Sequence, residues 1–142
     1  LGRFFLNRKK EDEIAKSYAD DFRTKIVGLN DEIGCLSGGN QQKVIIARSL
    51  STSPKVVILD EPTRGIDAAA RGDVYNIIHR LKRSGVAVLL VSSDMEEIEE
   101  LADRAIIMFQ GRITGTFSRE ELTQDRLTSA SFGFKEEKEV SE

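Results

Sequence analysis

The feature that most limits the possible fold is a short apolar run ending in two carboxylates, at residues 56–61, with the sequence VVILDE. The apolar part is continuous, rich in β-branched residues and preceded by the turn-forming segment STSPK. This pattern is typical of a strand covered on both faces, as in parallel sheets. We therefore predict a parallel sheet in which Asp60 and Glu61 lie at the carboxyl end of a strand, where open α/β sheets bind ligands.

Helical and strand patterns alternate after this run, and their order implies right-handed crossovers and an α/β fold. The predicted elements are a helix over 67–83 closed by Gly85, a strand over 86–91, a short helix over 94–102, a strand over 105–109, and a tight turn leading to 114–117 and a terminal helix capped by Ser118.

Two helices are predicted before the apolar run. Ile14, Tyr18, Phe22 and Ile26 recur every four positions, which indicates a helix from Glu13 to near Gly28. A second helix is expected to follow Ser37 as its N-cap, with its buried side formed by Val44, Ile45 and Ala47.

Composition narrows the possible functions. The net charge of -3 argues against a nucleic-acid-binding surface. The apolar run at 86–91 is far shorter than the roughly 20 residues that cross a bilayer. The single cysteine, Cys35, forms no internal disulfide, which fits a reducing cytoplasm. The chain begins at Leu1, so we expect a piece of a larger protein.

The segment LSGGNQQK, residues 36–43, predicts an anion site at the start of a helix. Ser37, Gly38 and Gly39 leave backbone N–H groups open, the helix dipole favours negative charge, and missing Cβ atoms let a phosphate approach closely. The alternative is an ordinary glycine-rich loop before a helix.

The two carboxylates at the end of the apolar run suggest a second function, in which Asp60 holds Mg²⁺ and Glu61 polarises an attacking water. Its alternative is a strand that merely ends in acidic residues.

Taken with VLLVSSDMEEIEELADRAIIMFQGRI, these segments resemble the ATP-binding subunits of ABC transporters, over residues 13–118. The motif sequences LSGGNQQK, EPTRGID and SSD are similar to those in the second nucleotide-binding half of monosaccharide importer ATPases of the ribose, galactose and xylose type. The resemblance implies that Asp60 and Glu61 are the Walker B pair, that Asp67 belongs to the D-loop at 65–67, and that Ser93 stands where a switch histidine is usual. It also implies a signature motif of Leu36, Ser37, Gly38, Gly39, Asn40, Gln41 and Gln42.

The implied fold is a truncated domain, the later strands of a P-loop NTPase-like parallel core with part of the ABC helical subdomain. The expected boundaries are a connecting arm at 1–12, a helical subdomain segment with the signature at 13–53, a core segment at 54–118, and a C-terminal helix with a disordered tail at 119–142. The implied ligands are ATP and Mg²⁺. No Walker A loop is present, so the isolated chain is predicted to be inactive.

The implied partners are a first nucleotide-binding domain on the same parent chain, whose bound ATP would receive this signature, membrane permease subunits, and indirectly a sugar-binding protein. These partners place the parent on the cytoplasmic face of the membrane. Serine carries no positive charge, so Ser93 predicts weak hydrolysis at this half's own site. Two other functions stay open: a non-catalytic regulatory half, and a soluble ABC-type ATPase without a role in transport.

Overall fold

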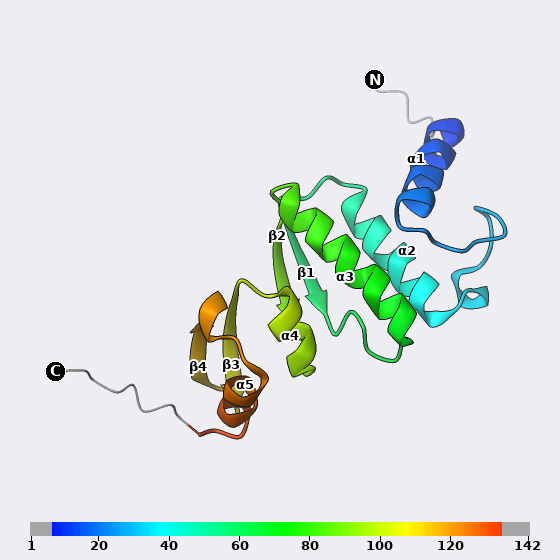
Figure 1. The fold of residues 1–142 in the computed structure, drawn as a ribbon. Coiled ribbons are helices and arrows are strands. Elements are labelled where there is room, and N and C mark those ends of the chain that lie inside the picture. The colour runs from blue at the N-terminus through cyan, green and yellow to red at the C-terminus, as the bar shows by residue number, and fades with distance from the viewer. Residues whose placement is uncertain (1–6, 135–142) are drawn as a thin grey trace. The chain divides into compact units, whose positions relative to one another are not determined.

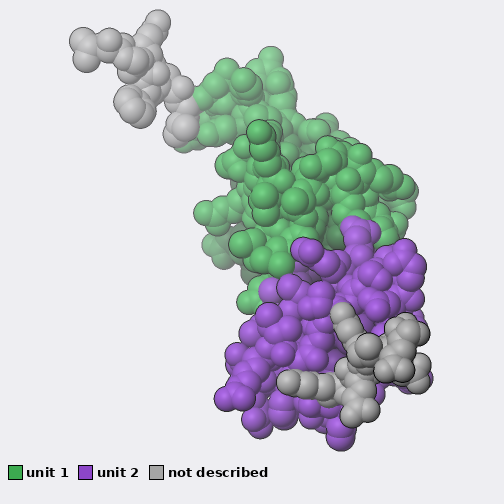
Figure 2. All heavy atoms as spheres, turned by 90° about the vertical axis from the view of Figure 1, so that its left-hand side faces the viewer, with its two compact units in different colours: residues 1–89 green, residues 90–142 purple. Residues whose placement is uncertain are grey.

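The structure is a computed structural model that describes residues 7–134. The chain divides into two compact units, Leu1–Leu89 and Leu90–Glu142, coloured separately in Figure 2. The expected tail at 135–142 and the first part of the expected arm lie outside the described residues. No helix within residues 7–134 has the length and apolar content needed to cross a bilayer.

The first unit consists of helices packed beside a short parallel strand pair (Figure 1). Strands β1 and β2 pair with each other, and both arrows point the same way in Figure 1. Helix α2 packs against both α1 and α3. The elements are α1 (Arg8–Asp21), the short 3₁₀ helix η1 (Ile33–Cys35), α2 (Gly38–Leu50), β1 (Val56–Asp60), α3 (Ala68–Arg83) and β2 (Ala87–Val91), whose last residues are grouped with the second unit.

Helix α1 is shifted toward the N-terminus relative to the prediction. It begins at Arg8, inside the expected connecting arm, and ends at Asp21 rather than near Gly28. Phe22 forms the C-cap, and Arg23 then adopts a left-handed conformation with φ 50°, which breaks the helix. The four-residue apolar period therefore continued past the helix end, and Ile26 lies outside it.

The buried side of α2 was predicted wrongly. Ile45 is 50% exposed, and the residues that are buried are Gly39, Lys43, Ile46 and Leu50. These residues follow the i, i+4, i+7, i+11 spacing of one helix face. The prediction failed because it excluded Gly39 and Lys43, a residue without a side chain and a charged residue.

The strand β1 is covered on one face only, which corrects the expectation of burial on both. Val57 and Leu59 are buried, whereas Val56 is 59% and Ile58 is 66% exposed. The backbone bond from Ala87 N to Lys55 O sets the register, and Leu89 on β2 is also 55% exposed. The apolar side chains of alternate residues thus form a bare sheet face in this chain.

Helix α3 agrees closely with its prediction. Asp67 is its N-cap, Arg83 its last residue, and Gly85 follows in a left-handed conformation with φ 82°. Its core residues are Val74, Ile77 and Ile78, all with no more than 3% exposure. These apolar residues recur at helical spacing in the sequence, so their pattern marks the buried face of α3.

The second unit is built on an antiparallel hairpin. Strands β3 (Arg104–Phe109) and β4 (Arg112–Ser118) pair around a tight turn, where Gln110 and Gly111 have φ values of 48° and 76°. The strand predicted at 105–109 therefore pairs with β4 and does not extend the β1–β2 sheet. Helix α4 (Met95–Leu101), the 3₁₀ helix η2 (Arg119–Glu121) and α5 (Gln124–Ser131) complete the unit.

The core of this unit holds Ile98, Ala105, Ile107, Phe117, Leu122, Leu127 and Ala130. Ser118 is the predicted cap, and its backbone N–H donates to Glu121 Oε2 at 2.8 Å. The element that it starts is only the short η2, and the terminal helix follows as α5. Asp94 caps α4 through its Oδ1, which accepts from Glu96 N at 3.0 Å.

Candidate functional site

The signature segment begins a 13-residue helix, as the sequence predicted. Ser37 is the N-cap residue of α2 with extended backbone, and its carbonyl accepts the first helical bond from Gln41 N at 2.9 Å. Its hydroxyl makes no capping bond to the helix backbone. Residues 36–42, which we call the signature turn after the predicted motif, include the start of this helix. Because the first N–H groups of a helix lack intrahelical acceptors, the signature turn presents donors and the positive end of the helix dipole.

The two glycines of this turn have different roles. A Cβ on Gly39 would lie 2.3 Å from the Cβ of Ala70 on α3, so Gly39 is needed for helix packing. A Cβ on Gly38 would meet only Ile66 Cγ2 at 3.7 Å and Gly65 O at 3.9 Å, which are ordinary contacts. Both glycines were predicted to let a phosphate approach, but only the exposed Gly38 leaves open space for it.

The amide side chains of the turn bond within the protein. Asn40 Oδ1 accepts from Lys25 N at 2.9 Å, and Asn40 Nδ2 donates to Ser37 Oγ at 2.9 Å. Gln41 Nε2 donates to the carbonyl of Leu36 at 2.7 Å. Leu36 and Gln42 are half-buried. Asn40 and Gln41, both predicted to bind nucleotide, therefore also shape the turn itself.

The structure brings the signature turn into contact with the predicted D-loop. Gly65 has φ 76°, and Ile66 beside it faces Gly38. Asp67 caps α3 by accepting from Ala70 N at 3.0 Å. That hydrogen bond is the main reason why the pKa of Asp67 lies below its ordinary value, and the Lys25 ammonium contributes in the same direction. The Asp67 carboxylate, in the predicted D-loop, is thus stabilised in its ionised form at the start of α3.

The predicted Walker B carboxylates lie at the carboxyl end of β1. Asp60 is the last strand residue and is exposed, and Glu61 follows, half-buried. Glu61 has φ 47°, a left-handed conformation that is uncommon for a residue with a side chain and is concentrated at functional sites. The backbone turns here, and Arg64 N donates to Glu61 O at 3.2 Å.

A magnesium role fits these residues in number and type. Mg²⁺ in nucleotide sites is held by one or two carboxylates together with phosphates and waters. Asp60 supplies such an oxygen ligand at an exposed strand end. Within residues 7–134 no group of three or more histidine, cysteine or acidic residues is placed to hold a metal by itself.

Ser93 lies in the second unit, in the segment between β2 and α4, and is exposed. It is followed by Asp94, which caps α4. The assignment of Ser93 to the switch position stays a prediction.

Sequence reasoning missed an ion pair between a buried lysine of α2 and a partly exposed aspartate of α3. Lys43, only 4% exposed, extends from α2 and places Nζ 2.7 Å from Asp73 Oδ2 on α3. The same Nζ donates to the carbonyl of Arg23 at 3.1 Å. A signal was present, because Lys43 lies four positions after Gly39 and so on the same helix face.

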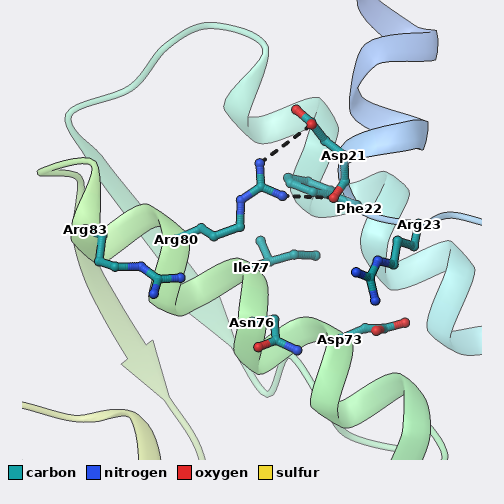
Figure 3. Close-up of a pocket in the computed structure, with 8 residues that line it drawn as sticks. All are labelled: Asp21, Phe22, Arg23, Asp73, Asn76, Ile77, Arg80 and Arg83. Atoms are coloured by element: carbon teal, nitrogen blue, oxygen red, sulfur yellow. Dashed lines mark hydrogen bonds and ion pairs between the residues drawn. The ribbon is translucent and has the colours of Figure 1, made fainter.

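A pocket of about 280 Å³ opens elsewhere in the first unit, between the end of α1 and α3 (Figure 3). Arg80 NH1 donates to the carbonyl of Asp21 at 2.8 Å, and its guanidinium lies 5.9 Å from the ring centre of Phe22. No predicted site residue lines this pocket. Its lining residues are Asp21, Phe22, Arg23, Asp73, Asn76, Ile77, Arg80 and Arg83.

Comparisons with known proteins agree with the resemblance. The family model described as ABC transporter matches residues 7–64, which include the signature segment and both carboxylates. A ribose import ATP-binding protein of Rubrobacter xylanophilus is 48% identical over 129 residues, covering 91% of this chain and 25% of the relative. A xylose import ATP-binding protein of Moorella thermoacetica is 45% identical over 130 residues, covering 92% of this chain and 26% of the relative.

Solved structures support the fold. A dimeric bacterial ABC transporter cassette matches with a TM-score of 0.72 at 23% identity, over 83% of this chain and 51% of that one. A nucleotide-free ATP-binding cassette from an ABC transporter matches with a TM-score of 0.74 at 25% identity, over 89% of this chain and 50% of that one. The chain thus spans about a quarter of the length of the curated relatives and about half of these cassettes.

Proposed function

The chain belongs to the ATPase domains of ABC transporters, and on that premise we propose that it donates its signature turn to an ATP molecule bound on a partner nucleotide-binding domain. The parent protein hydrolyses this ATP to energise import of a monosaccharide. The two relatives are named as a ribose import and a xylose import ATP-binding protein, and these names support the substrate class.

The observation that carries the proposal is the exposed start of α2. Gly38 is exposed and open to approach, whereas Gly39 is closed off by Ala70. The turn therefore offers backbone N–H groups, a serine hydroxyl and the helix dipole toward the outside of the unit. An anionic phosphate group carried by another domain can reach it there.

The carboxylates act on a different nucleotide in this proposal. Asp60 is assigned to the Mg²⁺ that accompanies ATP, and Glu61 to orientation of the attacking water. The bound metal supplies charge neutralisation for the phosphates. Ser93 takes the switch position and supplies a hydroxyl donor without positive charge, which predicts slow turnover at this half's own site.

The proposed partners follow from the same assignment. They are the first nucleotide-binding domain of the parent chain, transmembrane permease subunits and, indirectly, a sugar-binding protein. The dimeric cassette among the matching structures supports the pairing of two such domains. The parent would then lie on the cytoplasmic face of the membrane, held by the permease.

The isolated chain is proposed to bind MgATP weakly and to lack activity. A P-loop and its lysine supply most of the contacts to the β- and γ-phosphates, and neither occurs in this sequence. Calorimetric titration of the 142-residue chain with MgATP tests this statement. Stoichiometric binding with a micromolar or lower Kd would contradict it.

The function itself is tested by steady-state ATPase activity of the full-length parent assembled with its permease. Gly38→Asp places a carboxylate against the partner's phosphate, so turnover should fall by at least about a hundredfold. Glu61→Gln removes the water-orienting group of this half. Turnover near the unmodified rate in Gly38→Asp would disprove signature donation.

A non-catalytic regulatory half is the second candidate, favoured by serine at position 93. It predicts that Glu61→Gln is nearly silent while Gly38→Asp is not. If both variants lose turnover, then hydrolysis needs both nucleotide sites: the one that receives this signature turn and the one that uses Glu61.

A further inference from the structure

Asn40 occupies a position between a backbone donor and the signature serine. Its Oδ1 faces Lys25 N at 2.9 Å and its Nδ2 faces Ser37 Oγ at 2.9 Å. These bonds join the segment after α1 to the start of α2, since Lys25 and Asn40 are 15 residues apart. The asparagine thus connects two segments through one planar amide.

The chemistry of these partners fixes which way the amide faces. A backbone N–H only donates, so the atom opposite Lys25 must be the carbonyl oxygen of Asn40. The NH₂ group then necessarily faces Ser37. Ser37 Oγ accepts this bond, which leaves the hydroxyl hydrogen of Ser37 available to donate elsewhere.

The segment that fixes the amide is itself anchored. Lys43 Nζ donates to the carbonyl of Arg23 at 3.1 Å and pairs with Asp73 at 2.7 Å. Arg23 lies two positions before Lys25, so the buried ammonium holds the stretch from which the Lys25 N–H projects. The position of the Lys25 donor is therefore set by α2 and α3 together.

We propose that Asn40 is a positioning residue that polarises Ser37, so that the serine hydroxyl donates its hydrogen to a phosphate oxygen of the nucleotide on the partner domain. This inference rests on the proposed function. It reassigns Asn40 from direct contact with nucleotide to action through Ser37.

The test is a double-mutant cycle on ATPase activity of the full-length parent assembled with its permease. Ser37→Ala should lower turnover by about tenfold or more, because one donor to the phosphate is lost. Asn40→Ala should lower it by about 3- to 10-fold, the value of one oriented hydrogen bond. In the Ser37→Ala background, Asn40→Ala should change turnover by less than about twofold, because the residue through which it acts is gone.

Gln41→Ala is the matched control, since its amide bonds the carbonyl of Leu36 and not Ser37. In the Gln41→Ala/Ser37→Ala double variant, the fold-losses of turnover from the two substitutions should multiply. Asn40→Asp keeps an acceptor opposite Lys25 but turns the Ser37 hydroxyl inward, because a carboxylate only accepts. This variant preserves the anchoring bond and should lose at least as much turnover as Ser37→Ala.

Three outcomes overturn the inference: multiplicative effects of Asn40→Ala and Ser37→Ala, unmodified turnover in Asn40→Asp, or unmodified turnover in Ser37→Ala. Gly38→Asp separates these from failure of the proposed function. If Gly38→Asp abolishes turnover while the cycle is multiplicative, signature donation stands and only the role of Asn40 is wrong. If Gly38→Asp is silent, signature donation itself is wrong.

Discussion

Lys43 Nζ lies 2.7 Å from Asp73 Oδ2, and this ion pair ties α2 to α3. The lysine side chain is 5% exposed and the aspartate side chain 37%. A charged group in such a position is costly to leave without its partner. The pair therefore holds the two helices that frame the signature turn.

Asp73→Asn should destabilise the domain by about 1–3 kcal/mol, because it leaves the Lys43 ammonium with only part of its compensation. Asp21→Asn is the matched control. Asp21 pairs with Arg80 at 3.7 Å where both side chains are about half exposed, 53% and 48%. Exposed pairs contribute less than about 1 kcal/mol. Thermal unfolding of the full-length ATPase should show the larger drop in Tm for Asp73→Asn, and equal drops would contradict the account.

Gly39→Ala should lower the unfolding temperature, whereas Gly38→Ala should leave it nearly unchanged. The added methyl meets the Ala70 Cβ at 2.3 Å in the first case and nothing closer than 3.7 Å in the second. Overpacking of this kind typically costs about 1–3 kcal/mol. The double variant Gly39→Ala/Ala70→Gly should recover part of the loss, and failure to recover would show that the contact is not its cause.

Glu61→Gly should be tolerated better than Glu61→Val, because both remove the Glu61 carboxylate but only glycine adopts the left-handed φ of 47° without a steric penalty. Glu61→Val should instead be destabilising by about 1–2 kcal/mol, since a β-branched residue is strained there. Circular dichroism melts of the two variants give the comparison. A Glu61→Gly protein that melts well below Glu61→Val would refute the backbone argument.

Asp67 should titrate below its ordinary pKa of 3.8, since the bond from Ala70 N favours the carboxylate. A depressed folded pKa means that the stability it contributes is complete above the ordinary value and is lost as pH falls below it. Carbon-detected NMR titration of the Asp67 carboxyl group measures this directly. A midpoint at or above the ordinary value would be incompatible with the cap. Asp67→Asn should remove this part of the acid dependence of stability while keeping a capping side chain.

Local patterns in the sequence were sufficient for α3, the hairpin turn and the start of α2. The apolar spacing of Val74, Ile77 and Ile78 and the glycine at position 85 specify a helix face and its end without outside help. The sheet was different. The run at 56–59 reads as buried on both faces, but Val56 and Ile58 are exposed, because coverage of the second face depends on other segments and not on the strand's own residues.

At the candidate site too, short local motifs could be predicted from the sequence, whereas contacts between distant residues could not. The sequence alone was enough to predict a signature, a D-loop and a pair of Walker B carboxylates, since each is a short contiguous motif. It did not separate the roles of Gly38 and Gly39, because that difference comes from Ala70, which is distant in sequence. The hydrogen bonds that link Lys25 through Asn40 to Ser37 could not be predicted from the sequence either. They use a backbone N–H that any residue at position 25 except proline would supply.

The most direct test of signature donation is to find where the γ-phosphate of ATP lies in the assembled transporter. A photoreactive group attached to the γ-phosphate would be activated in the full-length ATPase with its permease, and labelled peptides would be mapped by mass spectrometry. The account predicts label on the peptide containing residues 36–42, lost in Gly38→Asp. Label confined to other peptides while ATP is bound and hydrolysed would contradict it.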